Sequence, residues 1–271
     1  MHVRCLDELS SIRTNHRWAL MPRLVHAEEV WGTVVALDLR SDSQSEEALK
    51  SVRDDMVSYF YEIDRLFSTY KPESEISRLR IGELAISDAS PVVQEIWQLC
   101  REARECTEGA FDPWAARGGF DPSGYVKGWA ADRALDMACK AGIEHVQINA
   151  GGDISLLGGL AIGEPWSIGI RHPDDDQAIA QIVTLADGAI ATSGTYERGA
   201  HIVDPSTDLP AIGARSATVV GPDGGVADAL ATALIVAGRN GAHWFVELTD
   251  YSAWVVDRHG DQTWAIGPAF S

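Results

Sequence analysis

This sequence has few cysteines, few basic residues and no long apolar run. The four cysteines are Cys5, Cys100, Cys106 and Cys139, and none forms a CxxC pair. Their spacing predicts neither a zinc site nor a disulfide framework, and it favours reduced, mostly buried thiols. No stretch of 18 apolar residues occurs, so we expect no transmembrane segment. The charged first 25 residues lack the apolar core of a secretory signal, which predicts a cytoplasmic location.

Positive charge is scarce relative to negative charge. Lys and Arg total 22 and Asp and Glu total 40 among 271 residues, which gives a formal net charge of −18. Such an acidic chain is not expected to bind nucleic acid through broad phosphate contacts. A local cation can still hold one small anionic ligand. Hydrophobic residues at 45% and charged residues at 23% are typical of a globular protein and exclude a disordered, collagen-like or coiled-coil chain.

Hydrophobic periodicity predicts long helices first and a strand-rich half after them. Residues 1–27 are interpreted as a polar arm, and no linker divides residues 28–271, which favours one domain. This order predicts an α+β fold with mixed or antiparallel sheets and flanking helices. The expected helices are Ser45–Phe67, Pro91–Thr107, Val126–Lys140, Val226–Ala237 and Gly241–Leu248. The expected strands are Glu29–Leu39, Val146–Asn149, Ile154–Leu157, Trp166–Arg171, Ala180–Leu185, Ala189–Thr192, Ala217–Val220, Trp254–Val256 and Thr263–Ile266.

A carboxylate and a hydroxyl lie four residues apart in VADALATALIVA, at Asp228 and Thr232. On a helix they share one face, and the neighbouring positions are apolar or alanine, so we expect the carboxylate to be buried. A buried carboxylate must be paired, hydrogen-bonded or bound to a metal, and these oxygen ligands suit Mg²⁺ or Ca²⁺. The alternative is structural, with Asp228 stabilising the helix N-terminus and Thr232 bonding back to a carbonyl.

The segment FDPSGYVKGWAA places Lys127 in the first turn of a helix that follows Gly124. Backbone N–H groups and a lysine together form an anion site suited to phosphate. Because a cation at this end of a helix opposes the macrodipole, Lys127 needs a compensating anion. The alternative is a surface lysine paired with Asp121 or Asp132.

Other segments combine small, aromatic and acidic residues in loops. INAGGD (148–153) has a glycine pair after a strand, which allows either close backbone approach to a ligand or a plain tight turn. TSGTYERGAHIVDP (192–205) contains His201, a candidate general base or a structural hydrogen-bonding residue. GAFDP (109–113) and FSTYKPESEISRL (67–79) are compatible with turn chemistry alone. No GxGxxG or P-loop pattern occurs in the sequence.

Taken together, these segments resemble the ApbE family of FAD:protein FMN transferases. The resemblance runs in the family's order from Trp31 to about Gly238. It implies the α+β fold peculiar to this family, with FAD bound in a cleft and Mg²⁺ at its pyrophosphate. The matching segments are WGT (31–33), FSTYKPESEISRL, GAFDP, DPSGYVKGWAAD (121–132), INAGGDI, TSGTYERGAHIVDP and VADALATALIVAG.

The resemblance also implies an activity. Family members cleave FAD between its two phosphates, transfer FMN to a Thr or Ser hydroxyl of an acceptor flavoprotein, and release AMP. Some members use water instead and act as Mg²⁺-dependent FAD pyrophosphatases, which is one alternative. A non-catalytic FAD-binding protein is another, although binding alone would not need a base such as His201.

Position in the family motifs assigns individual residues to roles. His201, Lys127 and Asp228 are the implied catalytic residues, and His201 matches the base proposed for the acceptor hydroxyl. Asp228, Thr232 and the backbone carbonyl of Gly124 are the implied metal ligands. The implied FAD contacts are Trp31, Ser68, Thr69, Tyr70, Ala110, Phe111, Asp112, Asp121, Lys127 and Val203.

Three features depart from the family pattern. The segment from Asp112 to Asp121 is short where many members carry an insertion, which predicts an altered cleft or target surface. DPSTDL (204–209) has Asp208 where glycine is common in the family. Many members are exported lipoproteins, whereas this sequence contains no lipobox, so we expect an acceptor that faces the cytoplasm.

Overall fold

The fold is built on an antiparallel sheet of eight strands, in the order β1-β2-β3-β4-β7-β10-β11-β12. The computed structural model describes residues 21–195, 202–258 and 262–270. The strands of this sheet are β1 (Arg23–Val30), β2 (Thr33–Arg40), β3 (His145–Ala150), β4 (Asp153–Leu157), β7 (Gly188–Gly194), β10 (Ala214–Gly221), β11 (Ser252–Asp257) and β12 (Thr263–Ile266). Two hairpins lie outside it: β5 (Trp166–His172) with β6 (Asp175–Leu185), and β8 (Val203–Asp204) with β9 (Leu209–Pro210).

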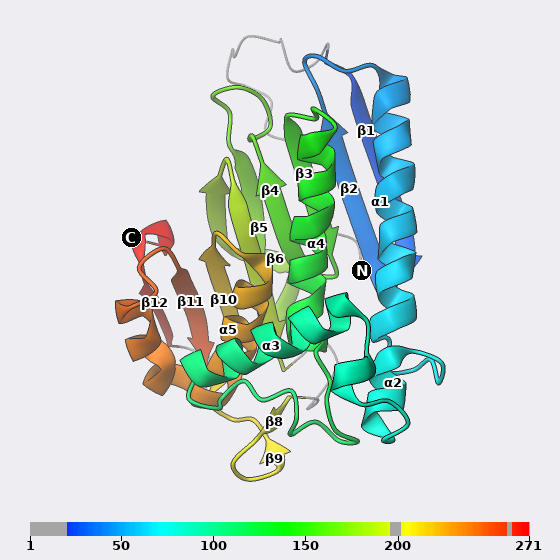
Figure 1. Cartoon of the computed structure of the whole chain (residues 1–271). Helices are drawn as coiled ribbons and strands as arrows, with labels where there is room; N and C mark the ends of the chain where they lie inside the picture. Colours follow the sequence, from blue (N-terminus) through cyan, green and yellow to red (C-terminus); the bar gives the residue numbers. More distant parts are fainter. Residues whose placement is uncertain (1–20, 196–201, 259–261, 271) are drawn as a thin grey trace.

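Helices cover one face of the sheet (Figure 1). The α-helices are α1 (Glu46–Phe67), α2 (Glu75–Arg80), α3 (Pro91–Cys106), α4 (Ser123–Lys140) and α5 (Gly224–Ala237), and the 3₁₀-helices are η2 (Ile86–Asp88), η3 (Gly238–Val246) and η4 (Pro268–Phe270). Helices α1 and α4 pack on β2 and β3, and the β5–β6 hairpin packs on the other face through Trp166 and Ile168. The fold is therefore α+β, as the sequence predicts, and the sheets are antiparallel.

The four long helices form where the apolar spacing predicts them. Helix α1 begins after Ser45, whose side chain accepts a hydrogen bond from the backbone N–H of Ala48, as a helix cap does. The prediction for 241–248 is only partly correct, because η3 there is a 3₁₀-helix. The short helix α2 and the β8–β9 hairpin are missing from the sequence prediction. Both are too short to give a periodic signal.

The prediction of one strand over Glu29–Leu39 is wrong. The chain reverses there in a two-residue turn at Trp31 and Gly32, with φ of 58° and 67°, and Val30 pairs with Thr33. Positive φ at both central residues is the geometry that matches hairpin twist. Because Trp31 is apolar, the alternating pattern continues through the turn and hides it. Strand β1 also begins at Arg23, inside the segment interpreted as a polar arm.

Strand β4 directs alternate residues to opposite faces of the sheet, and this alternation places the polar site. Ile154 and Leu156 point toward the β5–β6 hairpin, where they join its apolar cluster. Asp153 and Ser155 therefore point toward the helices, where both side chains hydrogen-bond to residues of α4. Polar groups on this buried face need partners, and α4 and α5 provide them.

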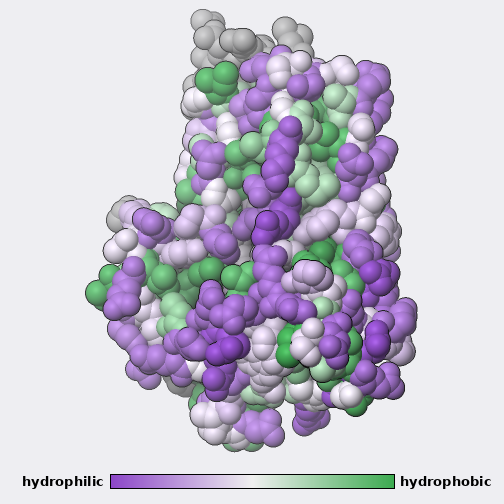
Figure 2. Space-filling view, in the orientation of Figure 1, coloured by the Kyte–Doolittle hydropathy of each residue, from purple (hydrophilic) through white to green (hydrophobic). Residues whose placement is uncertain are grey.

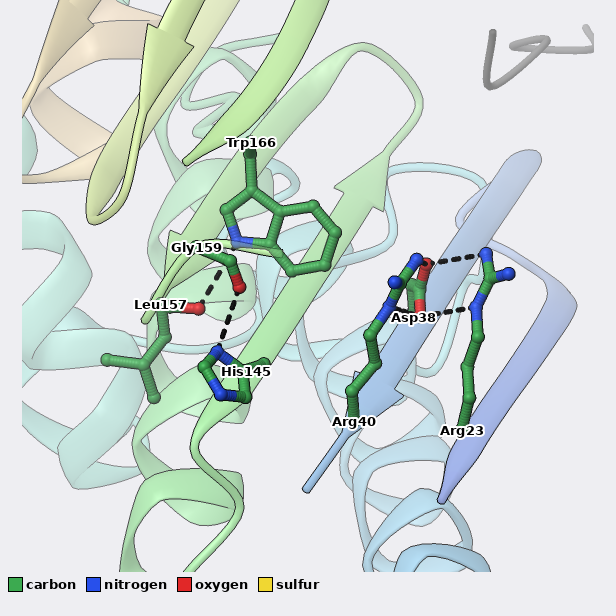
Figure 3. Close-up of polar contacts among 7 residues, drawn as sticks. All are labelled: Arg23, Asp38, Arg40, His145, Leu157, Gly159 and Trp166. Carbon is green, nitrogen blue, oxygen red and sulfur yellow. Dashed lines mark hydrogen bonds and ion pairs between the residues drawn. The ribbon is translucent and has the colours of Figure 1, made fainter. Parts of the chain in front are cut away.

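A charge cluster with a buried Asp38 and Arg40 and an exposed Arg23 stabilises the sheet on the hairpin side (Figure 3). Asp38 accepts hydrogen bonds of 3.0 and 2.8 Å from Arg40 and of 3.1 and 2.9 Å from Arg23. The Arg40 guanidinium lies over the Trp166 ring, with Cζ 5.3 Å from the ring centroid, and the indole donates to the Leu157 carbonyl. Burial alone would raise the pKa of Asp38, but the two guanidinium groups outweigh it and lower that pKa.

We expect Asp38→Ala to reduce the free energy of unfolding by about 3–5 kcal/mol, because it leaves the Arg40 charge buried without its partner. Arg40 is only 4% exposed. Urea denaturation at pH 7 measures the loss. The lowered pKa means that this stabilisation is present above the unfolded-state pKa and is lost as the pH falls through the folded-state pKa. The exposed Asp54, paired with Arg53 at 2.6 Å, is the control. Asp54→Ala should cost less than about 1 kcal/mol, and an equal loss from both variants would contradict the prediction.

The outer face of the helices is mainly polar. Figure 2 shows hydrophilic residues over most of this face, with apolar residues in smaller groups between them. Cys106 and Cys139 are exposed and only Cys100 is buried, so the expectation of mostly buried thiols is wrong for the described cysteines. Both exposed cysteines lie near the ends of amphipathic helices, where the polar face continues. Within the described residues, no helix is both long and apolar enough to cross a membrane.

Candidate active site

A buried ion cluster lies where α4, α5 and β4 meet. The Lys127 ammonium on α4 donates to the Asp228 carboxylate on α5, with Nζ 3.1 Å from Oδ2, and also to Oδ2 of Asp153 on β4. Asp153 and Asp228 are each 3% exposed. Lys127 therefore does have the compensating anion that the sequence requires. The alternative prediction, a surface lysine paired with Asp121 or Asp132, is wrong, because the lysine points into the fold and not along the helix surface.

Glycines allow the elements that carry this cluster to approach closely. A Cβ at Gly128 of α4 would collide with the Gly224 carbonyl of α5, so the two backbones touch at this point. In INAGGD, Gly151 and Gly152 have φ of 70° and 110° and form the tight β3–β4 turn. The turn places Asp153 at the first position of β4. The glycine pair thus serves as a turn, and its position brings the carboxylate that follows it to Lys127.

The electrostatics of the cluster favour a charged lysine. Burial alone would lower the pKa of Lys127, but the charges of Asp153 and Asp228 and their hydrogen bonds raise it above its ordinary value. Lys127 is therefore a cation throughout the physiological pH range. Two carboxylates and one ammonium carry a formal net charge of −1. The cluster thus has negative charge available for an additional cation.

The predicted metal ligands are neighbours in space. Thr232 follows Asp228 by one turn of α5, and its Oγ1 lies 3.1 Å from Oγ of Ser193 on β7. A Cβ at Gly124 would lie 3.3 Å from Thr232 Oγ1 and 3.3 Å from the Phe111 ring. The backbone at Gly124, with φ −85° and ψ 18°, departs from helical geometry at the start of α4. Asp228 and Thr232 thus lie on one face of α5, and the Gly124 backbone lies beside Thr232. Carboxylate, hydroxyl and carbonyl oxygens are donors of the kind that Mg²⁺ accepts.

These donors do not form a complete metal site from acidic side chains. Within the residues that the structure describes, no group of three or more His, Cys, Asp or Glu residues could hold a metal ion. Asp228 is the carboxylate of the set, and the other donors are a hydroxyl and a carbonyl. An ion bound here would need further oxygen ligands, of the kind that phosphate groups provide.

Asp112 and Asp121 lie on the segment that leads into α4. Asp121 accepts a hydrogen bond of 3.1 Å from the backbone N–H of Ser123, which orders the start of the helix. Asp112 pairs with Arg104 at 2.7 Å. Phe111 is buried and packs near Gly124. The segment therefore connects the GAFDP motif to the first turn of α4.

The short segment 112–121 is held by aromatic packing. Trp114 and Phe120 both contact Trp97 of α3, with ring centroids 5.0 and 4.6 Å apart, and they lie 5.1 Å from each other. Arg80 of α2 donates to the Gly118 carbonyl at 3.0 Å. This packing gives the shortened segment a fixed path between α2 and α3.

The remaining implied FAD contacts lie on other segments. Trp31 donates from its indole to the Phe60 carbonyl at 3.1 Å and is half-buried. Ser68 ends α1, and its carbonyl accepts a hydrogen bond of 2.6 Å from the Ser74 hydroxyl, whereas Tyr70 is 91% exposed. His201 lies outside the described residues. The set on other segments is Trp31, Ser68, Thr69, Tyr70 and Val203, whereas Ala110 lies beside Phe111 in GAFDP.

Two polar residues of the site are absent from the sequence prediction. Asp153 is the second carboxylate on Lys127, and Ser193 is the hydroxyl beside Thr232. Both lie within motifs described above, INAGGD and TSGTYERGAHIVDP. Asp153 lies one residue before the predicted strand Ile154–Leu157, and Ser193 lies one residue after the predicted strand Ala189–Thr192. The prediction therefore did not say which face of the sheet either side chain would point to.

Comparison with known proteins identifies the family. A model of the ApbE family matches residues 31–118 and 115–255, which is most of the chain. The chain belongs to the ApbE family. Similar curated proteins are the FAD:protein FMN transferases of Vibrio cholerae, 40% identical over 130 residues, and of Rhodobacter capsulatus, 37% identical over 128 residues. Each alignment covers 44% of this chain, but only 39% and 24% of the respective relative. The chain thus matches less than half the length of these two relatives.

Solved ApbE structures share the fold. The ApbE protein from Thermotoga maritima superposes with a TM-score of 0.80 at 24% identity, and covers 92% of this chain and 98% of its own. The flavin transferase ApbE from Vibrio cholerae gives a TM-score of 0.80 at 23% identity, with the same coverage. The structural likeness extends over nearly the whole of both chains, unlike the sequence alignments. It therefore supports the α+β assignment across the sheet and its helices.

The departure at Asp208 leaves the backbone in a glycine-like conformation. Asp208 has φ of 56°, in the left-handed region, at the turn between β8 and β9. Asp and Asn enter this region more readily than other non-glycine residues. The hairpin around Asp204, whose carbonyl accepts the Asp208 N–H at 2.9 Å, therefore forms without the glycine.

Proposed function

We propose that this protein is an FAD:protein FMN transferase. It cleaves the FAD pyrophosphate, attaches FMN through a phosphoester to a Thr or Ser of an acceptor flavoprotein, and releases AMP. The observation that carries the proposal is the partly buried Lys127 ammonium, which Asp153 and Asp228 hold at the α4–α5 contact, where Gly124 lies beside Thr232. Such a site suits a metal-bound pyrophosphate, and similar curated proteins bear this name.

The reaction is a substitution at the phosphorus of the FMN half. The acceptor hydroxyl oxygen forms a bond to that phosphorus, and the bond from the phosphorus to the bridging oxygen breaks. The bridging oxygen leaves as part of AMP, and the hydroxyl proton passes to a base. We assign the base to His201 by the family motif. Lys127 stabilises the negative charge on the phosphoryl oxygens, and its pairing with Asp153 holds the ammonium in place.

Asp228, Thr232 and the Gly124 carbonyl are proposed to hold Mg²⁺. When bound, the ion would polarise the phosphoryl oxygens and neutralise part of their charge. Because a hydroxyl and a carbonyl accompany one carboxylate, the protein supplies few charged ligands. We therefore expect tight Mg²⁺ binding only together with FAD, whose phosphates complete the coordination.

The implied flavin contacts are proposed to lie along the loop Ser68–Tyr70, the GAFDP segment and the β8–β9 hairpin. The exposed Tyr70 ring offers an aromatic surface, of the kind on which a flexible ligand can stack. We further propose that the chain from β1 onward, beginning at Arg23 and not at residue 28, acts as one domain. Helix α4 supports this view, because it contacts both α1 and α5.

The test mixes the purified protein with FAD, Mg²⁺ and a candidate acceptor flavoprotein that carries the Thr motif, and then measures intact masses. We expect the acceptor to gain the mass of one FMN less water, with an equal amount of AMP, and EDTA to prevent both. The acceptor with its motif Thr replaced by Val is the matched control, because it keeps the fold and lacks the hydroxyl.

Two other results would change the assignment. Free FMN and AMP with an unmodified acceptor would indicate an FAD pyrophosphatase, provided that a panel of acceptors gives the same result. FAD binding without any cleavage would overturn the proposal and indicate a binding protein.

A further inference from the structure

Asp132 makes two hydrogen bonds that lie apart from the proposed reaction centre. Its Oδ1 accepts from the Ser155 hydroxyl of β4 at 2.5 Å, and its Oδ2 accepts from the backbone N–H of Gly224 at 2.6 Å. Gly224 is the first residue of α5. One carboxylate thus connects α4 to both β4 and the N-terminus of α5. Backbone N–H groups at a helix N-terminus have no partner within the helix, and a carboxylate satisfies them well.

These bonds join the same three elements as the ion cluster. Lys127 of α4 binds Asp153 of β4 and Asp228 of α5, while Asp132, five residues along α4, binds Ser155 and Gly224. Figure 1 shows α4 and α5 in front of the same sheet, and their contacts are extensive. The Asp132 bonds therefore add a second polar connection between these three elements, beside the apolar packing of α5 on β7 and β10.

The two helices approach closely where Gly128 and Gly224 touch through their backbones. This glycine contact has no side chains of its own to interlock, and the Tyr125 ring of α4 packs beside it against Gly225. Asp228 lies one turn beyond Gly224 on the same face of α5. A shift of α5 along α4 therefore changes the Lys127–Asp228 distance directly, and the bonds of Asp132 to Ser155 and Gly224 oppose such a shift.

We propose that Asp132 is a positioning residue, whose bonds to Ser155 and Gly224 set the spacing of α4, β4 and α5 at which Asp228 meets Lys127. Asp132 does not touch the proposed substrate. It acts through α5, and its effect on the metal site rests on the proposed function. The two hydrogen bonds of Asp132 are properties of the fold and do not depend on the proposed function.

The surroundings of Asp132 are acidic, and they indicate how the bonds respond to pH. Asp132 borders a cavity of about 480 Å³ with Asp136 of α4, Asp187 of the β6–β7 turn and Asp223 before α5. Glu95 and Arg133 also line it and pair with each other at 2.6 Å. Burial, followed by the charges of Asp223 and Asp136, raises the pKa of Asp132 to about 6 despite the two bonds.

Both bonds can survive loss of the charge. If the oxygen facing Ser155 is protonated, the serine hydroxyl can rotate and accept, while the other oxygen still accepts from Gly224. An asparagine can bind in the same way. Because the folded-state pKa is raised, ionised Asp132 reduces stability increasingly as the pH rises toward and through about 6. We therefore expect Asp132→Asn to have a higher melting temperature than the wild type at pH 8, and an unchanged one near pH 4.

The experiment compares Asp132→Ala, Asp132→Asn and Asp136→Ala in the full chain. Asp136 is exposed on the same helix, so Asp136→Ala makes the same change in charge without removing these bonds. The readouts are the Mg²⁺ concentration for half-maximal FAD cleavage and the hydrogen exchange of residues 224–230. We expect the half-maximal Mg²⁺ concentration and the exchange rate to rise at least about tenfold in Asp132→Ala, because the variant removes both hydrogen bonds and the loss of one buried hydrogen bond is already worth up to about tenfold. In Asp132→Asn and Asp136→Ala, the half-maximal Mg²⁺ concentration and the exchange rate should stay within about twofold of the wild-type values. Asp38→Ala, destabilised on the opposite face of the sheet, should leave the Mg²⁺ requirement unchanged.

Each outcome decides the assignment. Wild-type Mg²⁺ dependence and wild-type exchange in Asp132→Ala would overturn it. An Asn variant as impaired as the Ala variant would also overturn it, because the charge and not the two bonds would then matter. If the wild type cleaves no FAD, the proposed function fails, but the exchange measurement still tests the connection between α4 and α5.

Discussion

Lys127→Met is expected to lower the free energy of unfolding by about 3–5 kcal/mol, because it removes a cation that pairs with two buried carboxylates. The ammonium contacts both Asp153 and Asp228, each 3% exposed. Methionine keeps most of the volume of the side chain, so the loss reports charge more than packing. Urea denaturation at pH 7.5 measures it.

The same variant should reduce FAD cleavage about 10²–10³-fold, the usual effect of removing one group that stabilises transition-state charge. Release of AMP at saturating FAD and Mg²⁺ measures this loss. Added Mg²⁺ should recover part of the stability, because a cation can replace the ammonium between the carboxylates. It should not recover turnover, since the oxygens of the transferred phosphoryl group still lack Lys127.

Lys140→Met is the matched control for this prediction. Lys140 is exposed in the last turn of the same helix, so its removal makes the same change in charge and composition. We expect a change of less than about 1 kcal/mol in stability and none in turnover. If Lys127→Met behaved like Lys140→Met, the ammonium would not be holding the two carboxylates.

The sequence predicted the long elements of the fold well because their signals are local. Helix α1 has a serine cap and apolar residues at helical spacing, and α5 is a nearly continuous apolar run. The β1–β2 turn was missed for an equally local reason. Trp31 and Gly32 do not form one of the common Asn-Gly or Asp-Gly turn pairs, and the apolar Trp31 continues the pattern of the strand.

The sequence pattern indicates the Asp228–Thr232 part of the candidate site but not the partners of Lys127. Asp228 and Thr232 are conspicuous as polar residues in an apolar helix, and Thr232 does lie beside Gly124. The partners of Lys127 could not be read in the same way. Asp153 lies 26 residues away on another element, and only the pairing of β4 within the sheet brings it under α4. Long-range pairing of this kind leaves no periodic mark in the sequence.

Asp228→Asn is expected to abolish most Mg²⁺-dependent FAD cleavage, with a loss of about 10³-fold, because it removes the one charged ligand proposed for the ion. The fold should be retained. Lys127 still pairs with Asp153, and the amide has nearly the volume of the carboxylate. AMP release is measured over a range of Mg²⁺ concentrations, and circular dichroism and urea denaturation test the fold.

Asp153→Asn is the control that separates a metal ligand from a partner of the lysine. Both carboxylates contact the same ammonium and both are buried, but Asp153 is not among the proposed ligands. We expect Asp153→Asn to lower the maximal rate while keeping the half-maximal Mg²⁺ concentration. Asp228→Asn should raise the half-maximal concentration above the range in which Mg²⁺ can be titrated. If the two variants shared one Mg²⁺ dependence, Asp228 would act only through Lys127. The ion would then have to be held by other oxygens of the site.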